Sequence, residues 1–126
     1  MRIIRYQTPE GNTTYGWILE DKVGEVQGQI FGEYRRREAR TPFKELKLLA
    51  PCEPSKIMCV GRNYIDHAKE LGNEVPKIPL IFLKPPSSII ATGEHIVLPS
   101  QSKQVEHEGE LVVVIGKRAR NVTAES

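Results

Sequence analysis

The sequence predicts a mainly β protein of the α+β class, with a small antiparallel unit at residues 1–50 and a second unit at residues 51–126. Most segments are short, carry β-branched and aromatic residues in alternation with polar ones, and end at turn residues. Only residues 62–72 combine a helical pattern with a helix stop signal. We place the boundary near Pro51, within a run of three closely spaced prolines: Pro42, Pro51 and Pro54.

The first unit contains three strand patterns, at residues 1–7, 13–20 and 23–28. The sequence PEGN separates the first two and DK separates the second from the third, and turn residues of this kind join antiparallel strands. The basic run EYRRREAR that follows includes two glutamates, so it is typical of a solvated face and not of a nucleic-acid patch.

The second unit begins with KIMCV, a buried type of strand, and continues into a short helix that Asn63 can cap and Leu71-Gly72 can end. The sequence LIFLKP predicts a further strand, PSSIIATGEHIVLP a turn and another short strand, and EHEGELVVVIGKRARNV the longest strand of the chain. On the helix, His67 and Glu70 are three residues apart and therefore share a face.

Composition excludes several classes of protein. The 126 residues are 39% hydrophobic and 27% charged, with a formal net charge of only +2, so no large basic surface for nucleic acid is expected. No apolar run approaches the roughly 20 residues of a membrane span, and the charged start MRIIR does not resemble a secretory signal. Cys52 and Cys59 form no CxxC pair, which favours a reduced, cytoplasmic protein.

Three glutamates, Glu106, Glu108 and Glu110, precede the apolar run LVVVIG. On a strand they would point to one side, where their charges repel one another. Solvent screening of an exposed strand edge is the ordinary explanation. A divalent cation is the other, since carboxylate oxygens suit Mg²⁺, Mn²⁺ or Ca²⁺.

Three further side chains have both an ordinary and a functional interpretation. His67 is either a half-buried polar residue or a base whose tautomer is fixed by Glu70. Lys84, at a strand end, either extends its amine to solvent or binds a substrate carboxylate. Cys59 is better explained as an inert core thiol than as a nucleophile.

Three motifs in this order resemble the fumarylacetoacetate hydrolase family: KIMCVGRNYIDHAKELG, IFLKPPSSII and VEHEGELVVVIGKRARNV. The resemblance covers most of residues 51–126, and the first 50 residues look like the small N-terminal domain of many bacterial and archaeal members. It implies that the second unit is the first part of a mixed β-roll, or sandwich, of the fumarylacetoacetate hydrolase type.

The resemblance also implies a site. The ExE pair of the family's metal centre matches Glu108 and Glu110, which would hold Mg²⁺ or Mn²⁺, and Ca²⁺ would also suit. The His–Glu dyad of the family matches His67 and Glu70. The family's third acidic ligand comes from a later strand, so we expect it beyond Ser126 and expect this chain alone to be incomplete.

The resemblance also implies which residues contact the substrate. Arg62 and Lys84 match positions that commonly contact the carboxylate or oxo groups of the substrate. The helix and the loop GNEVPKIP behind it resemble the lid that closes over the substrate in this family.

The expected function is divalent-metal-dependent C–C bond hydrolysis of acylpyruvate-like or fumarylacetoacetate-like 2-oxo acids, in aromatic catabolism, by a cytoplasmic homodimer. The same motifs equally serve a decarboxylase or isomerase of oxaloacetate-like or 2-hydroxyhepta-2,4-diene-1,7-dioate-like acids, because fold and metal do not fix the substrate. A non-catalytic, β-rich binding module remains the alternative from another class.

Overall fold

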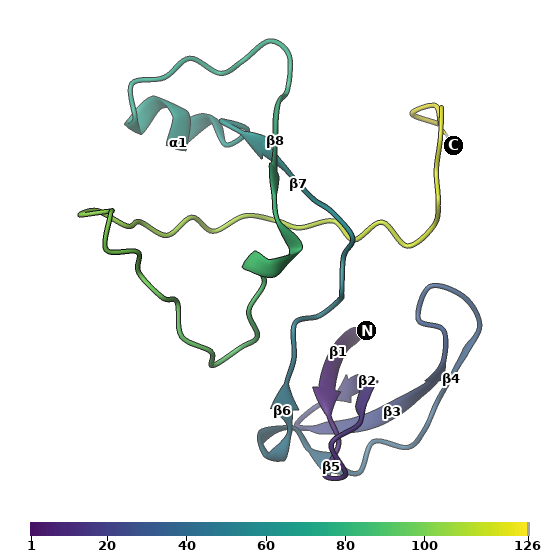
Figure 1. The fold of residues 1–126 in the computed structure, drawn as a ribbon. Helices are drawn as coiled ribbons and strands as arrows, with labels where there is room; N and C mark the ends of the chain where they lie inside the picture. Colours follow the sequence, from purple (N-terminus) through teal and green to yellow (C-terminus); the bar gives the residue numbers. More distant parts are fainter. Residues whose placement is uncertain (126) are drawn as a thin grey trace.

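A computed structural model describes residues 1–125, which form an N-terminal sheet and a second part with a smaller, two-stranded sheet, joined by an extended connection (Figure 1). The structure is mainly β, with short helices, as the sequence predicts. Among residues 1–125 no helix has the length and apolar composition that crossing a bilayer requires. Both cysteines are free and half-buried.

The N-terminal sheet is antiparallel throughout. Its strands β1 to β3 coincide with the three predicted segments. The order of strands in the whole sheet is β4-β3-β2-β1-β6, with β5 paired to β3. Three short strands were not predicted, because runs of two or three residues carry too little alternation to be recognised. The bounds are β1 Arg2–Gln7, β2 Thr13–Leu19, β3 Lys22–Gly28, β4 Tyr34–Arg36, β5 Thr41–Pro42 and β6 Lys47–Leu48, with a 3-10 turn at Phe43–Glu45.

The core of this sheet is small. Tyr6, Val23 and Val26 are its buried apolar side chains among the described residues. Gly16 on β2 lies against two of these side chains. A Cβ at this glycine would stand 2.5 Å from Cγ1 of Val23 and 2.9 Å from Cε1 of Tyr6. The glycine therefore makes the room in which the tyrosine ring packs on the sheet.

Polar contacts secure the outer strands. The Trp17 indole N–H donates to the carbonyl of Arg37 at 2.8 Å, and the Arg36 guanidinium lies 4.9 Å from the centre of the Trp17 ring. Arg5 on β1 forms an ion pair with Glu53 in the connection to the second part. The basic run is thus largely exposed, as predicted, and it also covers the sheet's only tryptophan.

The second part is built on an antiparallel hairpin of β7 (Ile57–Gly61) and β8 (Leu80–Lys84), both at predicted positions. The helix α1 (Ile65–Glu70) follows β7. Gly72 ends it in the left-handed conformation, with φ of 66°, as the sequence predicts. The predicted cap is wrong, because Tyr64, and not Asn63, occupies the N-cap position and no side chain caps the helix.

Two predicted strands are absent from the described residues. The segment 86–99 contains the 3-10 turn Pro86–Ser88 and, as predicted, a turn at Thr92–Gly93, but no strand. Residues 105–116, predicted as the longest strand, are extended without being paired (Figure 1). The alternation and β-branched residues are present, but a strand also needs a neighbour to complete its backbone hydrogen bonds. Within residues 1–125 no neighbour does so, and the side chains of Leu111 to Ile115 are exposed.

Candidate active site

The helix α1 carries the predicted dyad. The three-residue spacing brings His67 Nδ1 within 3.6 Å of Glu70 Oε2, while Ala68 on the opposite side is 1% exposed and anchors the helix. A separation of 3.6 Å is too long for a hydrogen bond, so Glu70 acts on the imidazole through its charge. The two side chains therefore form an electrostatic pair on the solvent side of a short helix.

A residue distant in sequence completes this cluster. Glu108 lies 41 residues after His67, and its Oε1 is 3.2 Å from His67 Nε2. The geometry assigns a proton to Nε2, because two unprotonated lone pairs would repel at this distance. The imidazole thus stands between two carboxylates, with Glu70 at one nitrogen and Glu108 at the other.

A second contact joins the same two segments. The backbone N–H of Leu111 donates a hydrogen bond of 2.9 Å to the hydroxyl of Tyr64, the residue directly before α1. The helix is therefore tied to the acidic segment at two points. These ties enclose Glu110, whose backbone lies between Glu108 and Leu111 in the chain.

The two candidate substrate contacts lie at opposite ends of the hairpin. Arg62 follows Gly61, which pairs with Leu80, whereas Lys84 pairs with Ile57 at the other end. Four residues along a strand span roughly 13 Å. The structure therefore places Arg62 beside the helix that carries His67, and Lys84 away from that end.

Arg62 also has an unusual backbone. Its φ of 55° lies in the left-handed region, which side chains with a Cβ rarely adopt. Such strain is commonly retained where a side chain must be held in one place. Arg62 is exposed, so packing does not account for its conformation.

Family comparisons identify the fold type of this site. Residues 56–126 match the family described as "Fumarylacetoacetate (FAA) hydrolase C-terminal", and residues 1–51 match the family described as "Rv2993c-like, N-terminal". The first match covers more than half of the chain. The chain belongs to the fumarylacetoacetate hydrolase family.

Known members of the family are similar over this region. "Protein Rv2993c" of Mycobacterium tuberculosis is 38% identical over 130 residues, covering 98% of this chain and 49% of that protein. "Oxaloacetate tautomerase FAHD2B, mitochondrial" of Homo sapiens is 49% identical over 84 residues, covering 66% of this chain and 27% of that protein. The chain spans from about a quarter to a half of the length of these relatives.

Solved structures support the fold. The structure of 5-carboxymethyl-2-hydroxymuconate delta-isomerase from Mycobacterium smegmatis superposes with a TM-score of 0.57 at 33% identity, over 71% of this chain and 35% of that one. Family members are typically enzymes, and these two names describe a tautomerase and an isomerase.

The side chains of Glu108 and Glu110 are of the chemical type that binds divalent cations. Members of the family generally use divalent metals, and Glu108 and Glu110, separated by Gly109, both carry carboxylate oxygens of the kind that such cations bind. Residues 1–125 contain no cluster of three or more His, Cys, Asp or Glu side chains arranged to hold a metal. Glu106 stands apart and accepts a hydrogen bond of 2.7 Å from Gln104.

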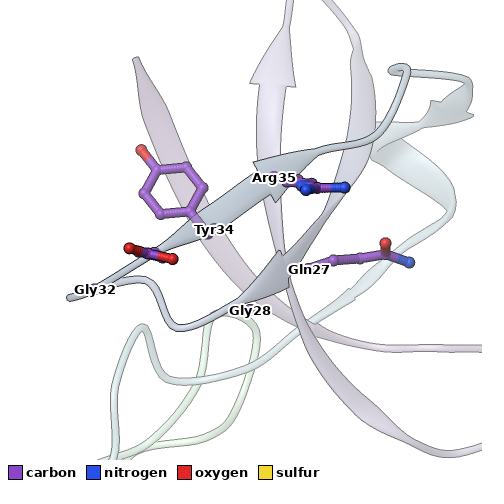
Figure 2. Close-up of a pocket in the computed structure, with 6 residues that line it drawn as sticks. Gln27, Gly28, Gly32, Tyr34 and Arg35 are labelled. Carbon is purple, nitrogen blue, oxygen red and sulfur yellow. The ribbon is translucent and has the colours of Figure 1, made fainter.

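A surface hollow elsewhere has no part in this cluster. It lies at the loop between β3 and β4 and is lined by backbone and polar side chains of that hairpin (Figure 2). The lining residues are Gln27, Gly28, Gly32, Glu33, Tyr34 and Arg35. It shares no residue with the second part of the chain.

Sequence reasoning missed Tyr64. A tyrosine at the start of a short helix has no distinctive spacing, and its partner is a backbone N–H, which no side-chain pattern reveals. Burial gives no signal either, because Tyr64 is 42% exposed.

Proposed function

We propose that the complete protein, including any residues beyond this chain, transfers a proton on a small 2-oxo acid and so catalyses enol–keto tautomerisation or a related isomerisation. The observation that supports this most directly is the 3.2 Å contact between His67 Nε2 and Glu108 Oε1. It brings a proton-carrying side chain to the edge of a carboxylate pair suited to a cation.

Each residue has a role in this proposal. Glu108 and Glu110 would contribute ligands to Mg²⁺ or Mn²⁺, which when bound supplies Lewis-acid stabilisation of negative charge on the 2-oxo group. His67 takes or gives the proton at Nε2, the nitrogen that faces the carboxylates. Glu70, whose carboxylate lies 3.6 Å from Nδ1, would keep the imidazole oriented toward Glu108.

Substrate binding is assigned by position. Arg62 adjoins the helix, so its guanidinium is suited to the carboxylate of the substrate. Lys84 starts roughly 13 Å away along the hairpin, so it would contact a distal group only of an extended dicarboxylic acid.

The names of the similar proteins favour proton transfer over bond cleavage, since they describe a tautomerase and an isomerase. The C–C hydrolysis expected from the sequence is the second candidate. The matching family model is named for fumarylacetoacetate hydrolase, and Nε2 would take a proton from a water molecule only after it has passed on the proton that it shares with Glu108. Decarboxylation of oxaloacetate-like acids is a third candidate, and release of CO₂ from oxaloacetate tests it in the same assays.

The test is turnover of oxaloacetate enol, an acylpyruvate and a hydroxymuconate-type acid by the complete protein with Mn²⁺. His67→Ala should reduce turnover of the preferred substrate by about 10²-fold or more, the usual contribution of a positioned acid or base, and should still bind Mn²⁺. His95→Ala is the matched control, because His95 is exposed and outside the cluster, and it should be unaffected. Undiminished turnover in His67→Ala would remove this residue from the mechanism.

Two further measurements address the remaining alternatives. Calorimetric titration with Mn²⁺ separates an enzyme of this type from a non-catalytic binding module, which would bind none. Analytical ultracentrifugation of the complete protein tests the expected homodimer.

A further inference from the structure

Tyr64 occupies a position between the two halves of the cluster. Its backbone is extended, with φ of −96° and ψ of 108°, and it forms the N-cap of α1 without capping it through its side chain. The side chain instead accepts the hydrogen bond from the N–H of Leu111. Tyr64 thereby connects the start of the helix to the residue that directly follows Glu110.

The segment that donates this bond has few other contacts near Leu111, and it approaches the N-terminal part at Gly116, where a Cβ would meet the ring of Phe31. Residues 101–125 form no helix or strand, and no backbone-to-backbone hydrogen bond among the described residues involves residues 105–116. Leu111 is 85% exposed, so its side chain supplies no packing either. The Tyr64 hydroxyl is therefore the partner that the described chain provides for the Leu111 amide.

The contact between His67 and Glu108 is the weaker of the two links between the helix and the acidic segment. The His67 and Glu108 side chains are 45% and 60% exposed, and ion pairs at such exposure contribute little and weaken with salt. That contact also depends on a side chain that must exchange its proton in the proposed reaction. A neutral hydrogen bond from a backbone N–H to a tyrosine hydroxyl changes with neither salt nor the protonation of His67.

We propose that Tyr64 is a positioning residue: its hydroxyl holds the backbone at Leu111, and thereby fixes the Glu108–Glu110 pair against the helix that carries His67. This inference rests on the proposed function for its consequence, since the pair matters as a cation site only if that function is right. Its structural core, the hydroxyl-to-amide tie, can be measured independently.

The experiment compares Tyr64→Phe with the wild type in the complete protein. Phenylalanine keeps the ring and removes only the hydroxyl. Amide exchange measured by NMR should become about 3- to 10-fold faster at Leu111, the range expected for losing one hydrogen bond. The Mn²⁺ dissociation constant from calorimetry should rise by a similar factor, and excess Mn²⁺ should restore most of the lost turnover.

Tyr34→Phe is the matched control. Tyr34 lies on β4 in the N-terminal sheet, and the same atom is removed there. It should alter neither the exchange of Leu111 nor the affinity for Mn²⁺.

The outcomes separate the two claims. Unchanged exchange at Leu111 in Tyr64→Phe would overturn the tie, and faster exchange with unchanged Mn²⁺ affinity would overturn the positioning role. A wild-type protein that binds no Mn²⁺ would refute the proposed function instead. Positioning by Tyr64 would then be upheld only if exchange at residues 108–111 still rises in Tyr64→Phe, and overturned if it does not.

Discussion

Replacing Arg62 by glycine should make the protein more stable and a poorer enzyme. Arg62 has φ of 55°, and a residue with a Cβ loses roughly 1–2 kcal/mol in this left-handed conformation. Glycine is free of that penalty, but its more flexible unfolded chain costs about 0.5–1 kcal/mol. The difference predicts a net gain of up to about 1.5 kcal/mol, centred on about 0.75 kcal/mol, in the free energy of unfolding for Arg62→Gly.

Function should change in the opposite direction. A charge-assisted hydrogen bond contributes about 1.5–3 kcal/mol. If Arg62 binds the carboxylate of the substrate, its loss should raise KM by about 10- to 100-fold. Arg62→Lys keeps the charge but not the paired donors, so it should fall between glycine and the wild type.

The assay is denaturant unfolding of the complete protein together with steady-state kinetics on its preferred 2-oxo acid. Glu20→Gly is the matched control, because Glu20 has φ of 54° in the turn between β2 and β3. It should show a similar gain in stability with unchanged KM. The reasoning fails if Arg62→Gly keeps the wild-type KM, or if Glu20→Gly is stabilised and Arg62→Gly is not.

Three other predictions concern the sheet and the lid. Burial, assisted by the charge of Glu25, raises the pKa of Tyr6, so the native state holds this proton more tightly than the unfolded chain. The stabilisation is therefore complete below the ordinary pKa of about 10 and declines as the pH rises above it, and urea unfolding should show a smaller alkaline decline in Tyr6→Phe. Gly16→Ala should lower the free energy of unfolding by about 1–3 kcal/mol, because the new methyl meets the Tyr6 ring, whereas Gly109→Ala, with nothing within 4 Å, should be neutral in the same titration. Residues 64–79 should gain amide-exchange protection when oxalate binds, and equal protection with and without oxalate would contradict a lid.

Local patterns predicted those parts of the fold that depend on local interactions. The strands β1, β2 and β3 follow one another through tight turns, so alternation and turn residues suffice to define them. The positions of β7 and β8 were predicted from their short apolar runs, and the end of α1 from Leu71-Gly72. The segment 105–116 has the same composition, but whether it becomes a strand depends on a neighbour that its own sequence does not specify.

The candidate site divides in the same way. The pairing of His67 with Glu70 follows from helical periodicity and is present at 3.6 Å. Contact between His67 and Glu108 spans 41 residues, so no spacing rule could provide it, and only the family resemblance placed both residues in one site. Lys84 was assigned by the same resemblance. The antiparallel register of β7 and β8 places Lys84 at the opposite end from Arg62, and neither motif alone predicts this register.

The acidic segment illustrates how a site can be held in place without a strand ladder. Glu110 has no hydrogen bond or ion pair of its own among the described residues, yet the residue two before it contacts His67 and the residue after it is held by Tyr64. Fixing both sides of a residue restricts its backbone and leaves its carboxylate available to bind a ligand. Both contacts are made by residues of α1 and its N-cap, namely His67 and Tyr64. The His67–Glu70 dyad and the Glu108–Glu110 pair should therefore move as one unit. A lid motion of residues 64–79 would therefore shift Glu108 and Glu110 together with His67, and would couple closure over the substrate to the geometry of the cation site.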